Sequence, residues 1–394
     1  MSATNVEIAI IGGGIIGNSI AYHLARQGRQ VLVIEQSSIA STPAASWASA
    51  GGVRRQGRHP AEAKLASEAI ERWKTLEQEL EADLHYRRGG NLLLAESDAE
   101  AEQLAAFVQQ QHAMGFADVR LLARSEVHAL VAGFNDRVVA GSYSPADGQA
   151  DPPRTTRAFA NAAGRHGATY WTGTSVLALL SDNGRVTGVR TERGEVSAQH
   201  VVLAAGAWSD ELALTISLRL PIRTYALQML LSTAEPSVTL QPVLSAVSRH
   251  LSLKQLNDGA FLIGGGWLGD ATPDRRAYTM RQASIEASWT TACDLLPAVG
   301  KQQIARSWCG LEAESLDQIP FIGPAPGLAG LTIVAGFSGH GFALAPAVGR
   351  AVAVQINGRP APELDGLSPD RIAHFQADQV EAFLSSISDA QNLG

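Results

Sequence analysis

A glycine-rich turn between an apolar strand and a helix constrains this chain more than any other feature. The first 36 residues run from an apolar stretch into Gly12-x-Gly14-x-x-Gly17, then a helical pattern, then a second apolar stretch that ends at Glu35. Gly12 allows the tight turn, Gly14 lets backbone N–H groups reach a pyrophosphate, and Gly17 lets helix and strand pack closely. A carboxylate at Glu35 accepts ribose hydroxyl protons and repels a 2′-phosphate. The pattern therefore predicts a dinucleotide site rather than a merely structural turn, with NADP disfavoured.

The composition is that of an enzyme with a large buried core. Hydrophobic residues make up 45% of the 394 residues and charged residues 18%, and this length predicts about two to three domains. The net charge of -7 argues against nucleic acid as a partner, and no apolar stretch is long enough to cross a bilayer. No basic residue precedes the first apolar run, so no secretory signal is expected. The two cysteines make neither a disulfide framework nor a metal site. We expect a soluble, cytoplasmic protein.

Hydrophobic periodicity alternates between helical and extended along the chain. Turn signals such as Asn183-Gly184 separate the short strands. The expected elements, in chain order, are helices over 60–82 and 99–113; a helix, hairpins turning at 183–184 and 192–195 and a buried strand within 151–209; strands with one long helix near 275–293 within 213–305; a strand, glycine-rich turn and helix over 331–358; and one apolar helix face over 370–387. The order of strand, glycine-rich turn and helix returns at the far end of the chain. If one dinucleotide fold uses glycine-rich turns from both ends of the chain, its cofactor must be longer than the adenosine half of NAD.

Four motifs follow one another in a specific order. After the N-terminal turn come VVLAAGAWS at 201–209, WCGLEAESLDQIPFIGPAPG at 308–327 and GFSGHGFALAPAVG at 336–349. With these motifs the chain resembles the D-amino acid oxidase superfamily of FAD enzymes, and within it the glycine oxidase and sarcosine oxidase branch. The resemblance covers essentially the whole chain. It implies FAD as the cofactor and an amine or amino acid as the substrate.

The predicted fold class is α/β, α+β overall, with a discontinuous Rossmann-type FAD-binding domain and an antiparallel-sheet substrate domain. We place the FAD-binding domain at 1–85, 145–212 and 306–394. The substrate-binding domain then takes 86–144 and 213–305. The resemblance implies that the antiparallel sheet covers the flavin.

The resemblance also assigns cofactor contacts to residues at matching positions. These residues are Gly12, Gly14, Ile16, Gly17, Glu35, Gln36, Ser46, Ala50, Gly51, Gly52, Val176, Ala205, Gly206, Trp208, Gly339, His340, Gly341 and Phe342. Backbone N–H groups of 339–342 would face the flavin N1 and C2 carbonyl, where negative charge develops on reduction. His340 is either a packed turn residue or a cation near the reduced flavin. Cys309 lies two residues from the position at which sarcosine oxidases attach flavin, so non-covalent FAD is expected.

The chemistry implied by the resemblance is hydride transfer to flavin N5 from the carbon beside an amine nitrogen, followed by hydrolysis of the imine. The protein has to align the C–H bond, keep the amine neutral and anchor the rest of the substrate. No dedicated catalytic base is required by this scheme. O2 and another electron acceptor both stay open, because Leu262 and Trp267 stand near the position of a lysine that sarcosine oxidases place over the flavin. Trp267 is either a packing aromatic or a wall of the substrate pocket.

One departure from the family concerns the substrate anchor. Glycine and D-amino acid oxidases carry a carboxylate-binding arginine where this chain has Glu312. Either the substrate presents a cation or a neutral group there, or Glu312 pairs with an arginine of the protein. Arg54 or Arg55 is the expected carboxylate anchor instead, the alternative being that they contact flavin phosphate or solvent.

Two other classes of function stay open. In the first, the chain is the flavin subunit of a heteromeric amino acid or opine dehydrogenase, inactive without its partner. In the second, it is a flavin-binding protein that has lost its activity, given Glu312. An NAD-only dehydrogenase is a weaker rival, which a bound yellow chromophore would exclude. Homo-oligomers and hetero-oligomers are both compatible with the sequence.

Overall fold

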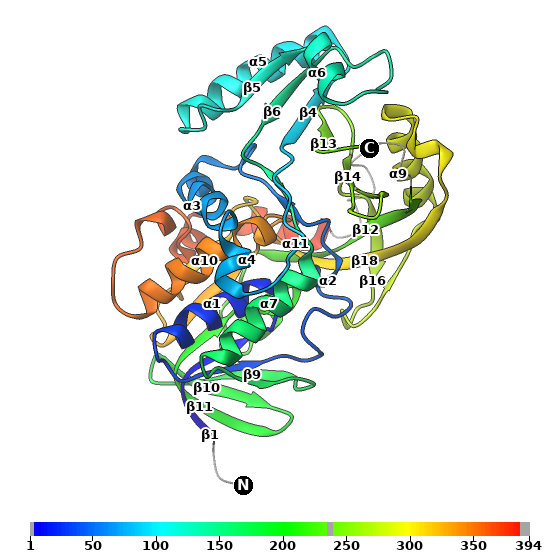
Figure 1. The fold of residues 1–394 in the computed structure, drawn as a ribbon. Helices are drawn as coiled ribbons and strands as arrows, with labels where there is room; N and C mark the ends of the chain where they lie inside the picture. The colour runs from blue at the N-terminus through cyan, green and yellow to red at the C-terminus, as the bar shows by residue number, and fades with distance from the viewer. Residues whose placement is uncertain (1–3, 235–238, 387–394) are drawn as a thin grey trace.

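The chain folds around two large sheets (Figure 1). The structure, a computed structural model, describes residues 4–234 and 239–386, and within them it contains an eight-stranded first sheet and a ten-stranded second sheet. Residues 1–3 and 387–394, which belong to predicted segments at both ends, lie outside the described residues. The combination of a largely parallel sheet, a largely antiparallel sheet and covering helices confirms the predicted α/β class, α+β overall.

The first sheet is parallel over most of its width, in the order β8, β2, β1, β11 and β20. An antiparallel edge strand, β19, and the β9–β10 hairpin beside β11 complete it. Its strands are β1 (Thr4–Ile11), β2 (Val31–Ile34), β8 (Thr169–Trp171), β9 (Val176–Asp182), β10 (Arg185–Thr191), β11 (Gly194–Leu203), β19 (Phe321–Pro324) and β20 (Leu331–Ala335). The parallel strands end at one edge, where open α/β sheets bind their ligands.

Helices connect the strands and cover the sheets. The helices are α1 (Ile15–Arg26), α2 (Ala45–Ala48), α3 (Ala63–Trp73), α4 (Leu76–Leu80), α5 (Asp98–Ala113), α6 (Arg124–Leu130), α7 (Pro152–Arg165), α8 (Ser209–Leu214), α9 (Gln282–Leu295), α10 (Gly341–Ile356) and α11 (Ala377–Ser385), with 3-10 turns η1 (Pro60–Glu62), η2 (Gly206–Trp208), η3 (Val299–Lys301), η4 (Pro362–Leu364) and η5 (Pro369–His374).

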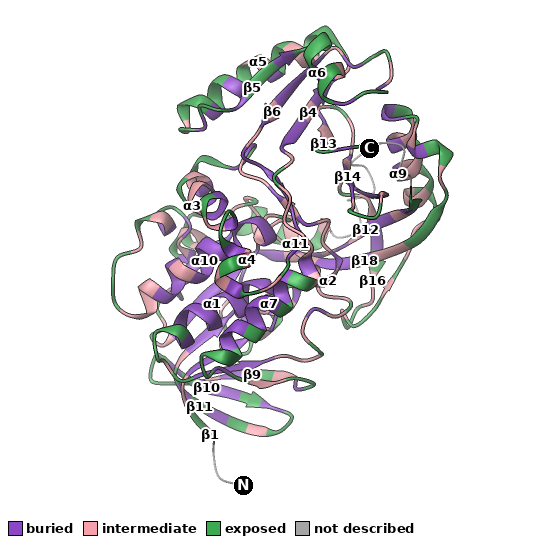
Figure 2. Cartoon of the chain, viewed as in Figure 1, coloured by how far each residue is buried: buried purple, intermediate pink, exposed green. Residues whose placement is uncertain are grey.

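Side chains of the first sheet alternate between two cores. In β1, Ile8 and Ile10 pack with α1, α3, α7 and α10, whereas Ala9 and Ile11 pack with the β9–β10 hairpin and α8 on the opposite face. Figure 2 shows that α1 and α10, which lie beside each other, are almost entirely buried. A sheet covered on both faces needs strands that are apolar throughout, which explains the unbroken apolar runs in the sequence.

The second sheet is antiparallel except for the pair β4 and β13. Its strands are β4 (Asn91–Ala95), β5 (Arg120–Ala123), β6 (Ala140–Ser144), β12 (Ile222–Ala234), β13 (Val243–Ala246), β14 (Ser252–Gln255), β15 (Ala260–Gly264), β16 (Leu268–Ala271), β17 (Tyr278–Thr279) and β18 (Ile304–Ser315), and a separate short ribbon pairs β3 (Gly52–Val53) with β7 (Gly148–Gln149). The predicted domain boundary at 306 falls inside β18, which pairs with β12.

One face of the second sheet turns toward the first. Directly opposite residues on paired strands share a face, so the register places Tyr225, Lys254, Leu262, Trp308, Gly310 and Glu312 together. We call this set the inner face. Trp308 Nε1 donates a hydrogen bond to the Ala48 carbonyl at 3.0 Å, and the Gly310 position leaves no room for a side chain beside Ala48. Helix α2 therefore lies directly on β18. The outer face, with Leu230 and Leu253, packs on α9.

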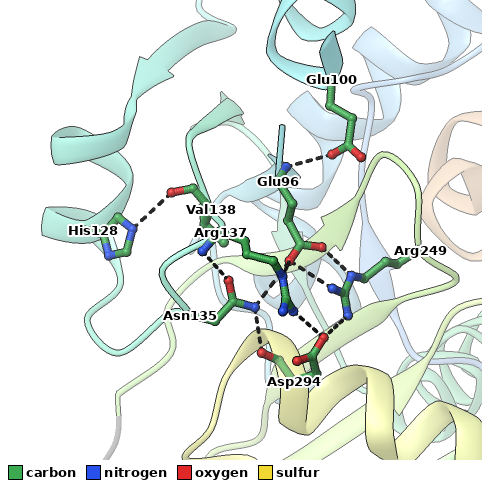
Figure 3. Close-up of polar contacts among 8 residues, drawn as sticks. All are labelled: Glu96, Glu100, His128, Asn135, Arg137, Val138, Arg249 and Asp294. Atoms are coloured by element: carbon green, nitrogen blue, oxygen red, sulfur yellow. Dashed lines mark hydrogen bonds and ion pairs between the residues drawn. The ribbon is translucent and has the colours of Figure 1, made fainter. Parts of the chain in front are cut away.

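An ion-pair network ties α9 to the strands around it (Figure 3). The guanidinium groups of Arg137 and Arg249 both pair with Glu96, at the end of β4, and with Asp294, near the end of α9. These two arginines hold the pKa of Asp294 down, to about 2. Asn135 adds a 2.6 Å hydrogen bond from its amide to the Asp294 carbonyl. The network joins the loop before β6 to α9 and lies away from the residues predicted to bind a cofactor.

Several predicted elements differ in detail from the structure. The helix predicted over 60–82 is divided into η1, α3 and α4. The helix predicted from 275 begins at Gln282, because Arg275 has a left-handed φ of 52° at the tip of a hairpin between β16 and β17. The last predicted helix is divided into η5 and α11, since Phe375 is extended and packs against Phe321. The turns at 183–184 and 192–195 are confirmed, with φ positive at both Asn183 and Gly184.

Neither a membrane helix nor a metal cluster is found in the part of the chain that the structure describes. No helix there is long and apolar enough to cross a membrane. No group of three or more His, Cys, Asp or Glu side chains within those residues is arranged to hold a metal ion.

Candidate cofactor and substrate site

A cavity of about 360 Å³ opens at the edge where β1, β2, β11 and β20 end. Residues that follow each of these strands line it, together with β18 from the second sheet. Its lining includes these predicted cofactor residues: Gly12, Gly14, Ile16, Glu35, Gln36, Ser46, Val176, Ala205, Gly206, Trp208, Gly339, Gly341 and Phe342. The predicted contacts Gly17, Ala50, Gly51, Gly52 and His340 lie outside that lining.

The glycine-rich turn owes its shape to close backbone approaches. Gly12 has a φ of 102°, and a Cβ there would lie 2.4 Å from the Ala204 carbonyl oxygen at the end of β11. A Cβ at Gly17 would lie 2.0 Å from the carbonyl oxygen of Gly12. Gly14 caps α1 without any side chain, and the next amide, that of Ile15, donates to Ser46 Oγ at 2.9 Å. The positive end of α1 therefore faces the cavity, as an anion site requires.

Glu35 stands at the end of β2 with its carboxylate already oriented. Gly13 N–H donates to one carboxylate oxygen at 2.7 Å and Ser37 N–H to the other at 2.9 Å. Burial raises the pKa of this carboxyl, and the two backbone donors oppose the shift. Each oxygen keeps lone pairs for further hydrogen bonds. A carboxylate, a helix N-terminus and a turn without side chains are the groups that an adenine dinucleotide needs, so these residues fit FAD.

Glu312 lies on β18 and lines the same cavity. Burial raises its pKa to about 7, although N–H groups of Gly339 and Ala313 donate to the carboxylate and oppose the shift. Glu312 forms no ion pair with any described residue. This disfavours the predicted alternative in which Glu312 pairs with an arginine of the protein. The cross-strand partner of Glu312 is Tyr225 on β12.

We predict that Glu312→Gln stabilises the FAD-free protein at alkaline pH. A carboxyl whose pKa rises on folding favours the folded state only while it is protonated, so stability falls between pH 4.5 and about 7 and is constant above that range. The variant lacks this loss, which amounts to at most about 3 kcal/mol. Thermal unfolding at pH 4.5 and pH 8 measures it.

The matched control is Glu314→Gln on the same strand. Glu314 accepts a 2.8 Å hydrogen bond from Arg223 in a half-buried ion pair, so its loss is expected to destabilise the protein at pH 8. Equal pH dependence in the wild type and in Glu312→Gln would contradict the assignment.

The predicted arginine anchors lie in different surroundings. Arg55 pairs with Asp118 and lies over the Phe116 ring, with 5.0 Å from its guanidinium carbon to the ring centroid, so its charge is already neutralised. No described residue forms an ion pair or side-chain hydrogen bond with Arg54, whose guanidinium is influenced by the buried carboxylates of Asp147 and Glu62. Of the two predicted candidates, Arg54 alone has a free guanidinium.

Arg58 was not singled out from the sequence, yet it is the more unusual arginine. It is 5% exposed, its Nε donates to the Arg54 carbonyl at 3.1 Å, and its Nη1 is buried with no partner in the described residues. Burial and the neighbouring Arg54 lower its pKa. The carboxylates of Glu62 and Asp147 act on it from a distance, but no direct ion pair forms with any described residue, and a buried cation without a direct partner favours a ligand of opposite charge. The signal that could have found Arg58 is a third arginine in the same segment, four residues after Arg54.

His340 caps α10 and turns its ring toward η1. Its Nδ1 lies 3.3 Å from Oε1 of Glu62, a fully buried residue. Burial and the charge of Arg58 lower the pKa of His340 to about 4 despite this carboxylate. The imidazole is therefore neutral at pH 7 and carries its proton on Nδ1, since a carboxylate only accepts. This arrangement favours the packed turn interpretation of His340 over the cation.

Two further predicted residues pack outside the cavity. Trp267 donates a hydrogen bond from Nε1 to the His250 carbonyl at 2.9 Å and stacks edge-on against the His250 ring, which favours the packing interpretation. Cys309 is fully buried, with Sγ 3.3 Å from the Met280 sulfur, and burial raises its pKa to about 12. A thiol this far from ionisation is unreactive as a nucleophile.

Lys254 is a second residue that the sequence analysis missed. It belongs to the inner face, is 3% exposed and has no carboxylate partner among the described residues. Its ammonium donates to the Ala150 carbonyl at 3.4 Å, and Ala150 N–H in turn donates to the Gly51 carbonyl at 2.9 Å. Burial lowers its pKa to about 7. An unpaired buried lysine beside a predicted flavin segment is a candidate for function.

Comparison with known proteins agrees with this geometry. The family model described as FAD dependent oxidoreductase (DAO) matches residues 7–355. Glycine oxidase from Bacillus licheniformis is 30% identical over 388 residues, which cover 95% of this chain and 98% of that protein. The mitochondrial dimethylglycine dehydrogenase of Rattus norvegicus is 26% identical over 95% of this chain, which spans only 45% of that enzyme.

A solved structure shows the same arrangement. The crystal structure of L-proline dehydrogenase from P. horikoshii superposes with a TM-score of 0.87 at 30% sequence identity, over 95% of this chain and 99% of that one. Three observations thus converge: the cavity at the carboxyl edge of a parallel sheet, the residues that fit FAD, and a family match over most of the chain. This chain belongs to the DAO family of FAD dependent oxidoreductases.

Proposed function

We propose that the enzyme oxidises the C–N bond of an amine or amino acid, of the secondary amine, N-methyl or D-amino acid type. The observation that carries this proposal is the cavity shared by the two sheets, which runs from Glu35 to Glu312 under β18. Relatives named glycine oxidase, dimethylglycine dehydrogenase and L-proline dehydrogenase act on such compounds by their names. The imine product would hydrolyse in water.

The proposed division of the chain follows the two sheets. We propose that residues 1–85, 145–212 and the segment after β18 bind FAD, and that 86–144, 213–305 and β18 form the substrate domain. FAD supplies the hydride acceptor when bound. It is proposed to be non-covalent, because Cys309 is buried against Met280 and far from ionisation.

Three charged side chains are proposed to hold the substrate. Arg58 and Arg54 supply positive charge for a carboxylate, which replaces the predicted role of Arg55. Glu312, whose raised pKa keeps it largely protonated below pH 7, can donate to a neutral group or, when ionised, face a substrate cation. This environment disfavours a second carboxylate at Glu312 and favours substrates whose single carboxylate binds Arg58 or Arg54.

Anaerobic bleaching of the flavin band tests the proposal. FAD-loaded protein is mixed without oxygen with glycine, N-methyl amino acids, D-amino acids, cyclic imino acids such as proline, opines and polyamines, and air is then admitted. Bleaching by one amine class is expected and identifies the substrate class. Fast recolouring in air indicates an oxidase, and slow recolouring indicates a dehydrogenase with another acceptor. If no compound bleaches the flavin, the alternatives of a missing partner subunit or a lost activity replace the proposal.

A further inference from the structure

A hairpin of the second sheet reaches across to the cofactor cavity. Strands β16 and β17 pair Asp270 with Thr279 and Ala271 with Tyr278, and the chain turns between them over 272–277. The turn is well bonded: the Thr272 N–H donates to the Ala277 carbonyl at 3.0 Å, and Thr272 Oγ1 donates to Asp274 at 2.6 Å. This tip therefore has a defined shape rather than being an open loop.

The central residue of the tip fastens it to the opposite side. Arg275 forms a two-pronged ion pair with Asp210, with Nη1–Oδ1 at 2.6 Å and Nη2–Oδ2 at 3.0 Å, and it also contacts the Ala207 carbonyl and Glu211. The two paired side chains are only 17% and 16% exposed. Planar, bidentate pairs of this kind are the stronger class of charged hydrogen bond. Arg275 holds a left-handed φ of 52°, a strained conformation for a residue with a side chain.

The residues on either side of Arg275 belong to the lining of the cofactor cavity. These residues are Asp274 and Arg276, and they line the cavity together with Trp208 and Leu212. Arg276 is the only basic side chain among the described residues of the lining, whereas four acidic side chains are present. Its guanidinium has no ion pair or hydrogen bond with any residue in the described ranges. A dinucleotide brings two phosphate charges into a cavity whose charged side chains are mostly acidic, and the N-terminus of α1 supplies only a partial positive charge.

We propose that the 272–277 tip is a cofactor strap: Arg275 fastens it to Asp210, and this places Arg276 to bind a phosphate of FAD. The strap joins the second sheet to the first both directly, through the ion pair of Arg275 with Asp210, and through the bound cofactor. It rests on FAD as the cofactor and does not depend on which amine is oxidised. FAD retention and the position of the second sheet are thereby coupled.

The phosphate contact is tested by FAD affinity. Apo-protein is titrated with FAD, following flavin fluorescence, for the wild type and for Arg276→Met, Arg276→Lys and Arg281→Met. Arg281→Met is the matched control, because Arg281 lies on the same part of the sheet, pairs with Asp270 outside the cavity and carries the same charge. Loss of one charged hydrogen bond is expected to raise the Kd of Arg276→Met roughly 10-fold to 100-fold. Arg276→Lys should recover part of this loss, and its affinity should fall with added salt more steeply than that of Arg276→Met.

The fastening is tested by the rate of FAD release. Arg275→Met and Asp210→Asn remove the same ion pair from opposite sides, so each should speed release and the double variant should release FAD no faster than the faster single variant. Additive effects would overturn the strap, and an Arg276→Met affinity equal to that of Arg281→Met would overturn the phosphate contact. Neither the FAD affinity nor the rate of FAD release requires a substrate to be measured. If the variants behave as expected but no amine reduces the bound flavin, the strap stands and the proposed amine oxidation fails.

Discussion

Gly17→Ala is expected to leave the protein unable to retain FAD at concentrations that saturate the wild type. The added Cβ would lie 2.0 Å from the Gly12 carbonyl oxygen and 3.4 Å from Ile10 Cγ2, and the first of these contacts is with backbone that cannot rotate away. Helix α1 would have to move off β1, which also displaces Gly14 and the Ile15 amide from the cavity. Overpacking of this kind costs about 1–3 kcal/mol or more, which corresponds to about 5-fold to 150-fold or more in affinity. The flavin-to-protein absorbance ratio and an FAD titration measure the effect.

Gly164→Ala is the matched control for Gly17→Ala. Gly164 lies inside α7, on the same side of the first sheet, with a helical φ and no atom within 4 Å of an added Cβ. Alanine there should bind FAD normally and stabilise the protein by about 0.5–1 kcal/mol, because glycine loses more backbone freedom on folding. Normal FAD retention by Gly17→Ala would contradict the close helix–strand packing as the reason for this glycine.

Arg58→Met is expected to raise the KM for a carboxylate-bearing amine by roughly 30-fold to 5000-fold. Arg58 is buried, its Nη1 has no partner among the described residues, and removing one member of a buried charge pair formed with the substrate costs about 2–5 kcal/mol. The effect should fall on the KM far more than on the maximal rate of flavin reduction, because the anchor holds the carboxylate in the ground state and the transition state alike. Anaerobic reduction followed over a range of substrate concentrations separates the two parameters.

Arg55→Met provides the contrast for Arg58→Met. Its guanidinium is already paired with Asp118 and lies over Phe116, so its loss should change the KM less than 10-fold. Equal effects of both substitutions on the KM would reject Arg58 as the anchor.

The sequence predicted the features whose requirements are local. Gly12, Gly14 and Gly17 stand a few residues apart, and their roles follow from backbone angles and contacts within one strand, turn and helix. The same holds for Glu35 at the end of β2 and for the hairpin turn at Asn183 and Gly184. Alternating apolar residues also predicted an antiparallel sheet over 213–305, because the period of a strand is visible in the chain itself.

The choice among charged residues was decided by tertiary contacts alone. Arg55 is neutralised by Asp118, 63 residues away, and Arg275 is fastened by Asp210, 65 residues away. Neither pairing leaves a pattern in the sequence, because an arginine that faces solvent, a partner or a ligand is the same letter. Burial without an ion-pair partner among the described residues, which singles out Arg58 and Lys254, is a property of the packed protein as well.

By itself, then, the sequence determined the α/β class, the dinucleotide turn and the FAD family, since these depend on short-range backbone geometry and on motif order. The tertiary structure decided which cations are free, that β18 belongs to the second sheet, and that a hairpin from that sheet reaches the cofactor cavity. These depend on which residues distant in the chain meet, and on the desolvation of charge that follows when they do.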